Sequence, residues 1–119
     1  MPTINKDSKR RECICLSTTR GFESIASADI VRIEALSNYS KIFFSNGKTL
    51  VVAKVLKWFE ARLCAEPFAR VHRTHLVNLA CIQSYVRGDR SRLVLRNGDS
   101  IEVARSKRKS FLDNWKTAA

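Results

Sequence analysis

The chain has 119 residues, of which 45% are hydrophobic and 28% charged, which excludes an intrinsically disordered chain and predicts one folded domain. Lys and Arg number 22 against 11 Asp and Glu, a formal net charge of +11. Unless this excess only solvates the surface, it favours a polyanionic partner: nucleic acid first, an acidic membrane surface second and an acidic protein third.

The first eleven residues are polar and basic and lack periodicity, so residues 1–11 are predicted to be a flexible tail or the remnant of a linker. Residues 12–17 alternate apolar and polar side chains, as a half-buried strand does, and residues 29–36 continue in extended form. Residues 41–52 contain Asn46-Gly47, which predicts a hairpin with a type I′ turn.

A helix is predicted at residues 53–64, because apolar side chains recur there at three- and four-residue steps and Pro67 prevents continuation. Residues 70–87 are rich in β-branched and aromatic residues. They are predicted to form two short strands with a kink near Asn78.

Residues 92–105 are predicted to form a second hairpin, on Asn97-Gly98. A last short helix is predicted from about Ser106. Residues 116–119 are expected to be a C-terminal tail.

The two predicted hairpins resemble each other: residues 41–54 and 92–105 align without gaps at an offset of 51 residues. Either they are copies of one unit, or any such hairpin that leads into a helix has this pattern. In both cases Lys54 and Arg105 stand at the exit of a hairpin and the mouth of a helix. That location suits an anion, because helix N-termini carry unpaired N–H groups and positive potential.

The cysteines form neither a metal-binding pattern nor a disulfide framework, since no CxxC spacing occurs. No run approaches the roughly 18 apolar residues that span a bilayer, and no apolar segment follows the basic N-terminus. We therefore expect a cytoplasmic protein without membrane contact. Its cysteines are expected to be small, mostly buried side chains: Cys13, Cys15, Cys64 and Cys81.

Catalytic motifs are missing from the sequence, which has no GxSxG, HExxH, P-loop or GxGxxG. Two histidines give little capacity for acid-base chemistry. His72 and His75 are three residues apart on a predicted strand, so their side chains are expected on opposite faces and cannot share a metal ion. No enzyme activity, metal or cofactor is expected.

In the segment RVHRTHLVN, residues 70–78, both faces of the predicted strand carry polar as well as apolar side chains near its start, whereas its end is apolar. This is the pattern of a core strand that emerges at the surface. Arg73 offers a planar fork for guanine or phosphate, and Thr74 a hydroxyl for a phosphate oxygen. The alternative is an exposed arginine that is only solvated. His72 either packs or contacts DNA, and Asn78 is expected to bond backbone groups.

Two further segments carry candidate contacts. Residues 37–41 are rich in short hydrogen-bonding side chains, which suit a turn and a tip that contacts a nucleic-acid backbone equally well. The run at residues 105–110 places positive charges at a helix start, where the helix dipole disfavours them, and such unfavourable choices often mark functional positions. The candidate DNA-binding residues are Asn38, Tyr39, Ser40, Lys41, Lys54, His72, Arg73, Thr74, Arg105, Ser106, Lys107 and Arg108.

Three stretches of the chain resemble the LytTR DNA-binding domain family over about residues 12–115. They are ADIVRIEALSNYSKIFFSNGK, FARVHRTHLVNLACI and LRNGDSIEVARSKRKSF, and their most specific parts are RVHRTHLVN and VARSKRK. The sequence departs from the family pattern at Arg32 and His75, where aromatic residues are more usual, and at Ala104, where serine is common.

The resemblance implies a mainly β fold: elongated antiparallel β-sheets in a β-β-β sandwich with one or two short helices. It also implies a transcription-regulator domain whose loops, rather than a recognition helix, enter successive major grooves. Double-stranded DNA is the expected partner, with a receiver or other sensory domain in a longer parent protein and a dimer on paired sites as further expectations. The alternatives are a single-stranded nucleic-acid or RNA binder and an interaction module for an acidic protein.

Overall fold

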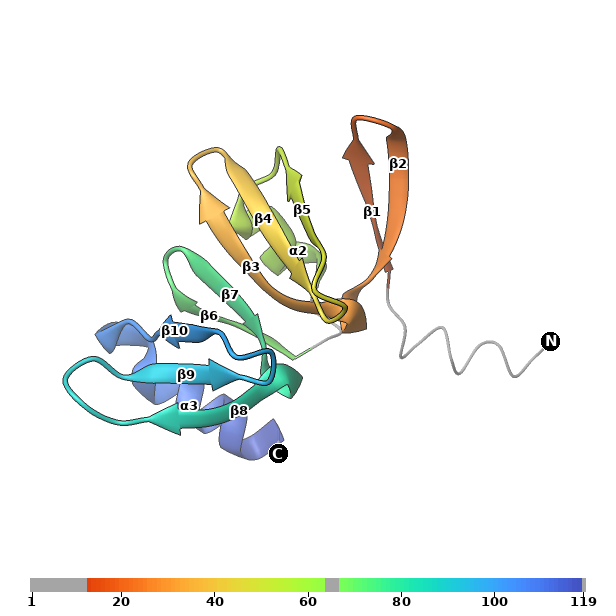
Figure 1. Cartoon of the computed structure of the whole chain (residues 1–119). Coiled ribbons are helices and arrows are strands. Elements are labelled where there is room, and N and C mark those ends of the chain that lie inside the picture. The colour runs from red at the N-terminus through yellow and green to blue at the C-terminus, as the bar shows by residue number, and fades with distance from the viewer. Residues whose placement is uncertain (1–12, 64–66, 119) are drawn as a thin grey trace.

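The computed structural model describes residues 13–63 and 67–118 (Figure 1). Residues 1–12, Cys64 and Ala119, on which predictions were made, lie outside this part. The described strands are β1 (Cys13–Thr18), β2 (Gly21–Ala26), β3 (Ile30–Leu36), β4 (Tyr39–Phe44), β5 (Thr49–Val52), β6 (Phe68–His72), β7 (His75–Asn78), β8 (Ile82–Val86), β9 (Arg92–Leu95) and β10 (Ser100–Glu102). The helices are η1 (Ser27–Asp29), α2 (Leu56–Arg62), η2 (Leu79–Cys81), η3 (Arg105–Lys107) and α3 (Arg108–Ala118).

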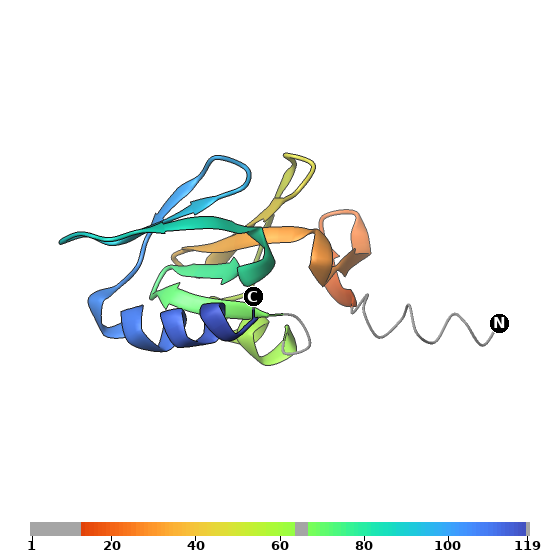
Figure 2. The same ribbon diagram turned by 90° about the horizontal axis from the view of Figure 1, so that it is seen from below.

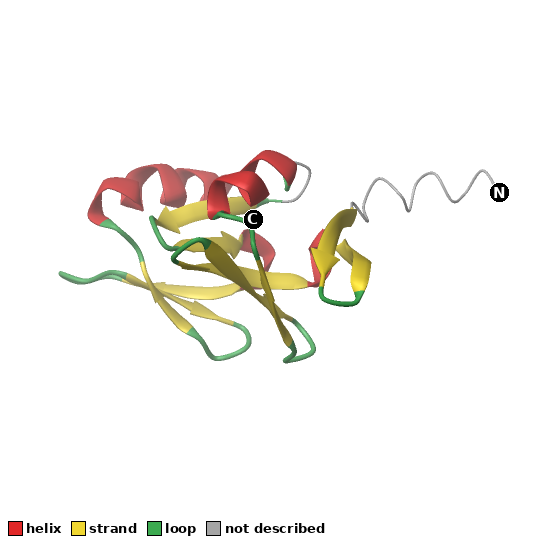
Figure 3. Ribbon diagram, turned by 90° about the horizontal axis from the view of Figure 1, so that it is seen from above, coloured by secondary structure: helices red, strands yellow, loops and turns green. Residues whose placement is uncertain are grey.

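The strands form three sheets in which every pair is antiparallel. β1 and β2 make a two-stranded ribbon, β10-β9-β8 a three-stranded sheet, and β5-β4-β3-β7-β6 a five-stranded sheet. The prediction of a mainly antiparallel β fold with short helices is therefore confirmed. Both α-helices lie on one side of the molecule, and the β4–β5 and β9–β10 turns project on the other (Figure 3).

The five-stranded sheet buries both of its faces. Neighbouring residues of β7 point to opposite faces, so Leu76 joins one core and Val77 the other. The first core also takes side chains from the β1–β2 ribbon and from α2: Ile14, Leu16, Ile25, Leu56 and Phe59. The second takes side chains from the three-stranded sheet and α3: Leu93, Leu95, Ile101 and Phe111. Each such burial stabilises the fold by about 1.5–3 kcal/mol.

The two Asn-Gly hairpins are present, but their turns are not type I′. Gly47 donates its N–H to Phe44 O at 3.0 Å, and Gly98 donates to Leu95 O at 2.9 Å. The glycines have φ values of 90° and 95°, whereas the preceding asparagines do not have positive φ. This is a three-residue loop that ends in a left-handed glycine and a bulge, an alternative that the dipeptide alone does not distinguish.

Several element boundaries differ from the prediction. The structure adds β2, which was not predicted, and α2 begins at Leu56, so that Val55 remains 48% exposed. α3 continues to Ala118, so residues 116–118, expected in a C-terminal tail, belong to this helix. Within the described residues no helix is long and apolar enough to cross a membrane.

The expectation of mostly buried cysteines is wrong for the described residues. Cys13 and Cys15 are exposed and Cys81 is half-buried. The cause is the alternation of β1, in which Ile14 and Leu16 take the inward face.

Candidate nucleic-acid interface

Backbone hydrogen bonds bring the predicted contact segments to one end of the molecule. Ala35 N donates to Thr74 O at 2.9 Å, which joins the end of β3 to the β6–β7 turn. Ala104 N donates to Val71 O at 2.8 Å, which joins β6 to the segment entering η3. Figure 1 shows the β3–β4 turn, the β6–β7 turn and the β10–α3 connection along the same edge. We call this edge, comprising residues 37–41, 54, 72–74 and 105–108, the basic edge.

The segment RVHRTHLVN is a hairpin, not one strand that emerges at the surface. Arg73 and Thr74 form the turn between β6 and β7, and His72 pairs with His75 in register. The predicted opposite facing of the two histidines is therefore wrong, and their ring centroids lie 5.5 Å apart. The alternation argument failed because a turn and a register shift between Arg70 and His72 interrupt the period of two.

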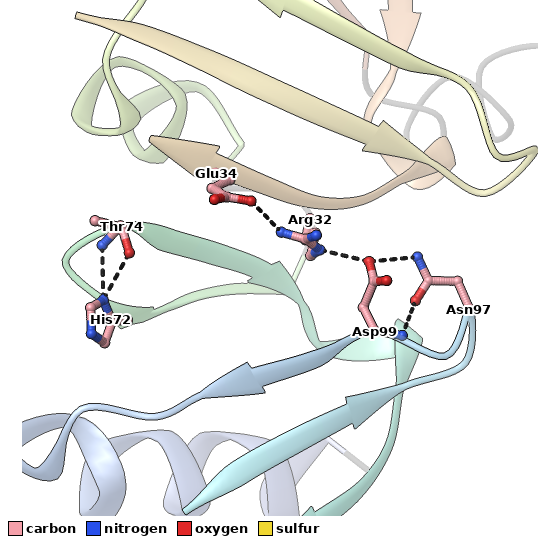
Figure 4. A network of polar contacts seen from close by, with 6 residues as sticks. All are labelled: Arg32, Glu34, His72, Thr74, Asn97 and Asp99. Atoms are coloured by element: carbon pink, nitrogen blue, oxygen red, sulfur yellow. Dashed lines mark hydrogen bonds and ion pairs between the residues drawn. The ribbon is translucent and has the colours of Figure 1, made fainter. Parts of the chain in front are cut away.

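The β6–β7 turn is held by side chains on both sides. Thr74 N donates to His72 Nδ1 at 3.2 Å, and the Thr74 hydroxyl lies 2.9 Å from the same nitrogen (Figure 4). The Arg70 guanidinium donates to Arg73 O at 2.5 Å, to His72 O at 3.2 Å and to a Glu60 carboxylate oxygen at 2.7 Å. The Arg73 side chain itself remains exposed. Sequence reasoning missed Arg70, because nothing distinguishes it from a solvated strand arginine.

In η3, the side chains of Arg105, Ser106 and Lys107 are exposed. Arg108 is half-buried and donates to Asp89 O at 2.7 Å, so its charge is directed toward the β8–β9 loop. An open depression of about 500 Å³ joins this segment to the β6–β7 turn. It is lined by Glu60, Arg70, His72, Arg73, Ala104, Ser106 and Lys107.

The β3–β4 turn exposes Asn38 and Tyr39, and Tyr39 is 52% exposed. Ser40, by contrast, is fully buried, and its hydroxyl donates to Lys54 O at 2.5 Å. In this conformation Ser40 ties the turn to the segment between β5 and α2 and does not present its side chain to a ligand. Lys41 is half-buried with its Nζ 5.2 Å from the Phe43 ring centroid, and Lys54 is exposed.

Arg32 occupies a buried position on β3, outside the basic edge. It pairs in register with Val77 and so faces the second core. Its guanidinium lies 2.8 Å from Asp99, 3.0 Å from Glu34 and 3.6 Å from the Phe43 ring centroid (Figure 4). Arg32, one of the three departures from the family pattern, is thus a buried cation with two carboxylate partners, and its bond to Asp99 joins β3 to the β9–β10 turn.

The titratable group with a resolved shift near the basic edge is His75. Burial lowers the pKa of this half-buried imidazole, the Glu34 carboxylate opposes the shift, and Arg32 and His72 reinforce it. Its Nδ1 is buried without a hydrogen-bond partner among the described residues. Within that same part, no group of three or more His, Cys, Asp or Glu side chains is arranged to hold a metal ion.

Comparison with known proteins shows which family the chain belongs to. The family model described as the LytTr DNA-binding domain matches residues 20–116. The chain belongs to the LytTR family. A solved LytTr DNA-binding domain, from a protein described as a methyl-accepting/DNA response regulator of Bacillus cereus, matches with a TM-score of 0.72 and 23% identity, covering 86% of this chain and 94% of that one. A comparison with curated proteins found no match.

This LytTR domain is therefore a DNA-binding domain of a family that is not a family of enzymes. The likeness in structure supports the fold. The roles of individual residues at the basic edge have to be argued from the geometry of this chain.

Proposed function

We propose that this LytTR domain binds double-stranded DNA with sequence preference, through turns of the basic edge that enter successive major grooves at paired repeat sites in promoters. The observation that carries the proposal is the convergence of the β3–β4 turn, the β6–β7 turn and η3 through backbone hydrogen bonds. Successive major grooves on one face of B-DNA are about 34 Å apart. The dimensions of the described chain, 48 × 35 × 24 Å, are compatible with that span.

In this proposal the exposed tips contact DNA and the buried groups hold them in place. Arg73 and Arg105 contact base edges or nearby phosphates, because an exposed guanidinium can bond guanine through two parallel hydrogen bonds. Contacts from the remaining exposed or half-buried groups go chiefly to the sugar-phosphate backbone. These are Asn38, Tyr39, Lys41, Lys54, Ser106 and Lys107. The supporting groups are Ser40, His72, Thr74 and Arg108.

The proposal extends to partners. We infer that the domain acts in the cytoplasm as the output part of a regulator of the two-component type, joined to a receiver or other sensory domain. Paired repeat sites would be occupied by two copies.

The alternatives receive less support from the structure. A single-strand or RNA binder needs exposed aromatic rings for base stacking. Phe59 is buried, and Phe43, Phe44, Trp58 and Trp115 are half-buried against the cores. The exposed rings among the described residues are Tyr39 at the basic edge and Phe22 on the β1–β2 ribbon, so the basic edge offers one ring and no series of stacking platforms. An interaction module for an acidic protein partner would bind all duplexes alike, without preference for a sequence.

The test begins with selection of bound duplexes from a random pool. The selected duplex, a scrambled duplex and the corresponding single strand are then titrated at several salt concentrations. We expect the selected duplex to bind more tightly than both others at every salt concentration. Equal affinity for selected and scrambled duplexes would remove the sequence preference, and preference for the single strand would favour the first alternative.

A further inference from the structure

The β8–β9 loop, residues 87–91, leaves the three-stranded sheet at the end that carries the basic edge. Val86 and Arg92, which flank the loop, are register partners, and Glu102 at the end of β10 also pairs with Arg92. The chain from Glu102 then runs into η3. Figures 1 and 2 show the loop projecting from this end of the molecule. It was not among the predicted contact segments.

Hydrogen bonds fix the base of this loop. Ser91 is buried, its hydroxyl lies 3.4 Å from Gly88 O, and Val103 N donates to Ser91 O at 2.9 Å. From the other side, Arg108 donates to Asp89 O at 2.7 Å. The loop is therefore attached both to the segment that precedes Arg105 and to the start of α3.

These bonds also give the order of the segments along the edge. The end of β3, which leads into the β3–β4 turn, is bonded to the β6–β7 turn, β6 to the residue before η3, and the adjacent Val103 to the base of the β8–β9 loop. The loop therefore follows η3 in the row, on the far side from Arg73.

The loop carries a net positive charge, because Arg87 and Arg90 outnumber its one carboxylate, Asp89. Arg87 and Arg90 are exposed, and among the described residues neither forms an ion pair with a carboxylate. Arg105 and Lys107 stand next in the row, so the protein concentrates like charges where they repel each other. A polyanion that spans the row relieves this repulsion.

We propose that the β8–β9 loop is a fourth DNA-contacting segment, in which Arg87 and Arg90 bind backbone phosphates at the end of the site beyond Arg105. This rests on the proposed function, because it needs a duplex lying along the basic edge. Phosphates are the ligand class, since a segment that flanks a groove-entering turn meets the backbone rim of that groove, where guanidinium groups bind. The loop adds affinity and length of contact, and it adds no base preference.

The test compares Arg87→Ala/Arg90→Ala with Lys48→Ala/Arg96→Ala. The control removes the same charge from the β4–β5 and β9–β10 turns, at the opposite end of the strands. Each protein is titrated with the selected duplex and with two shortened duplexes, which lack about one helical turn (~10 base pairs) of flank on one side or the other. Thermal melts establish that each variant is folded.

We expect the wild type to lose affinity when one of the two flanks is removed. The loop variant should bind the long duplex more weakly, be insensitive to removal of that flank and keep the same base preference. The slope of log K against log salt should become shallower by about 2, because two phosphate contacts are lost. Arg87→Lys/Arg90→Lys should recover most of the affinity, whereas the control should resemble the wild type.

Two results would overturn the loop proposal and leave the proposed function standing. One is a loop variant that behaves like the control, and the other is a loop variant that loses the same affinity on all three duplexes. A wild type with no preference among duplexes would instead overturn the proposed function, and the loop proposal with it.

Discussion

Arginine side chains take three different roles in this domain, although the sequence presents them alike. Arg32 is buried between two carboxylates, Arg70 bonds the carbonyls of the β6–β7 turn, and Arg73 projects from that turn into solvent. A net charge of +11 therefore overstates the charge offered to a ligand. What distinguishes the three roles is burial and hydrogen bonding, which make only the exposed guanidinium available for base contact.

Replacement of Arg73 by alanine tests the base-contact role. We expect Arg73→Ala to weaken binding to the selected duplex by about 1–3 kcal/mol and to relax preference at the contacted base pair. Lys107→Ala should weaken binding to all sequences about equally, because a phosphate contact carries no base information. The measurement is titration against the selected duplex and its single-base variants. An unchanged preference profile in Arg73→Ala would contradict the assignment.

His75 makes a second prediction, on stability against pH. Its pKa is lowered by burial from the ordinary value of 6.5, so between 6.5 and the lower folded value the unfolded chain binds more protons than the folded one. The free energy of unfolding should therefore fall as pH drops below about 6.5 and level off below the folded pKa. Urea unfolding of wild type and His75→Phe at several pH values isolates this contribution. Parallel pH profiles for the two proteins would contradict it.

At the scale of elements, the sequence predicts hairpins between neighbouring strands better than it predicts contacts between segments that are far apart in the chain. Asn46-Gly47 and Asn97-Gly98 each predicted a hairpin that is present, because turn chemistry is encoded in a few adjacent residues. The β6–β7 turn was not foreseen, since Arg73-Thr74 contains none of the glycine, proline or asparagine residues that usually mark turns. The grouping of the contact segments was expected from the family resemblance. The bonds that create it join residues 33 to 39 positions apart, which no local pattern reveals.

The Arg32–Asp99 pair is the clearest link between two elements, β3 and the β9–β10 turn. Asp99→Asn removes a carboxylate from a guanidinium that is 9% exposed, and we expect it to reduce the free energy of unfolding by about 1–3 kcal/mol. Combined with Arg32→Met it should cost less than the sum of the single changes, because the unpaired buried charge is removed. Asp89→Asn, at an exposed carboxylate, should stay within about 0.5 kcal/mol. Additive effects of the first two changes would show that the pair is not coupled.

At the scale of the whole molecule, function depends on the antiparallel topology. Each strand returns the chain to the opposite end, so turns collect at two ends of the sheets and one end can specialise. Two cores, on both faces of the five-stranded sheet, hold the three sheets together. The basic edge is thereby supported by strands rather than by a mobile arm, and the contacts are preorganised.

The last prediction concerns the number of phosphates that this edge neutralises. About six contacts from the basic edge give a slope of log K against log salt near −5, and two more from Arg87 and Arg90 give a slope near −7. We therefore expect a slope near −7 for the wild type and near −5 for Arg87→Ala/Arg90→Ala on the selected duplex. Lys48→Ala/Arg96→Ala should keep the wild-type slope although it has the same net charge as the loop variant. Equal slopes for the two double variants would mean that the total charge of the domain, and not the position of the charges at one end of the sheets, determines the salt dependence of DNA binding.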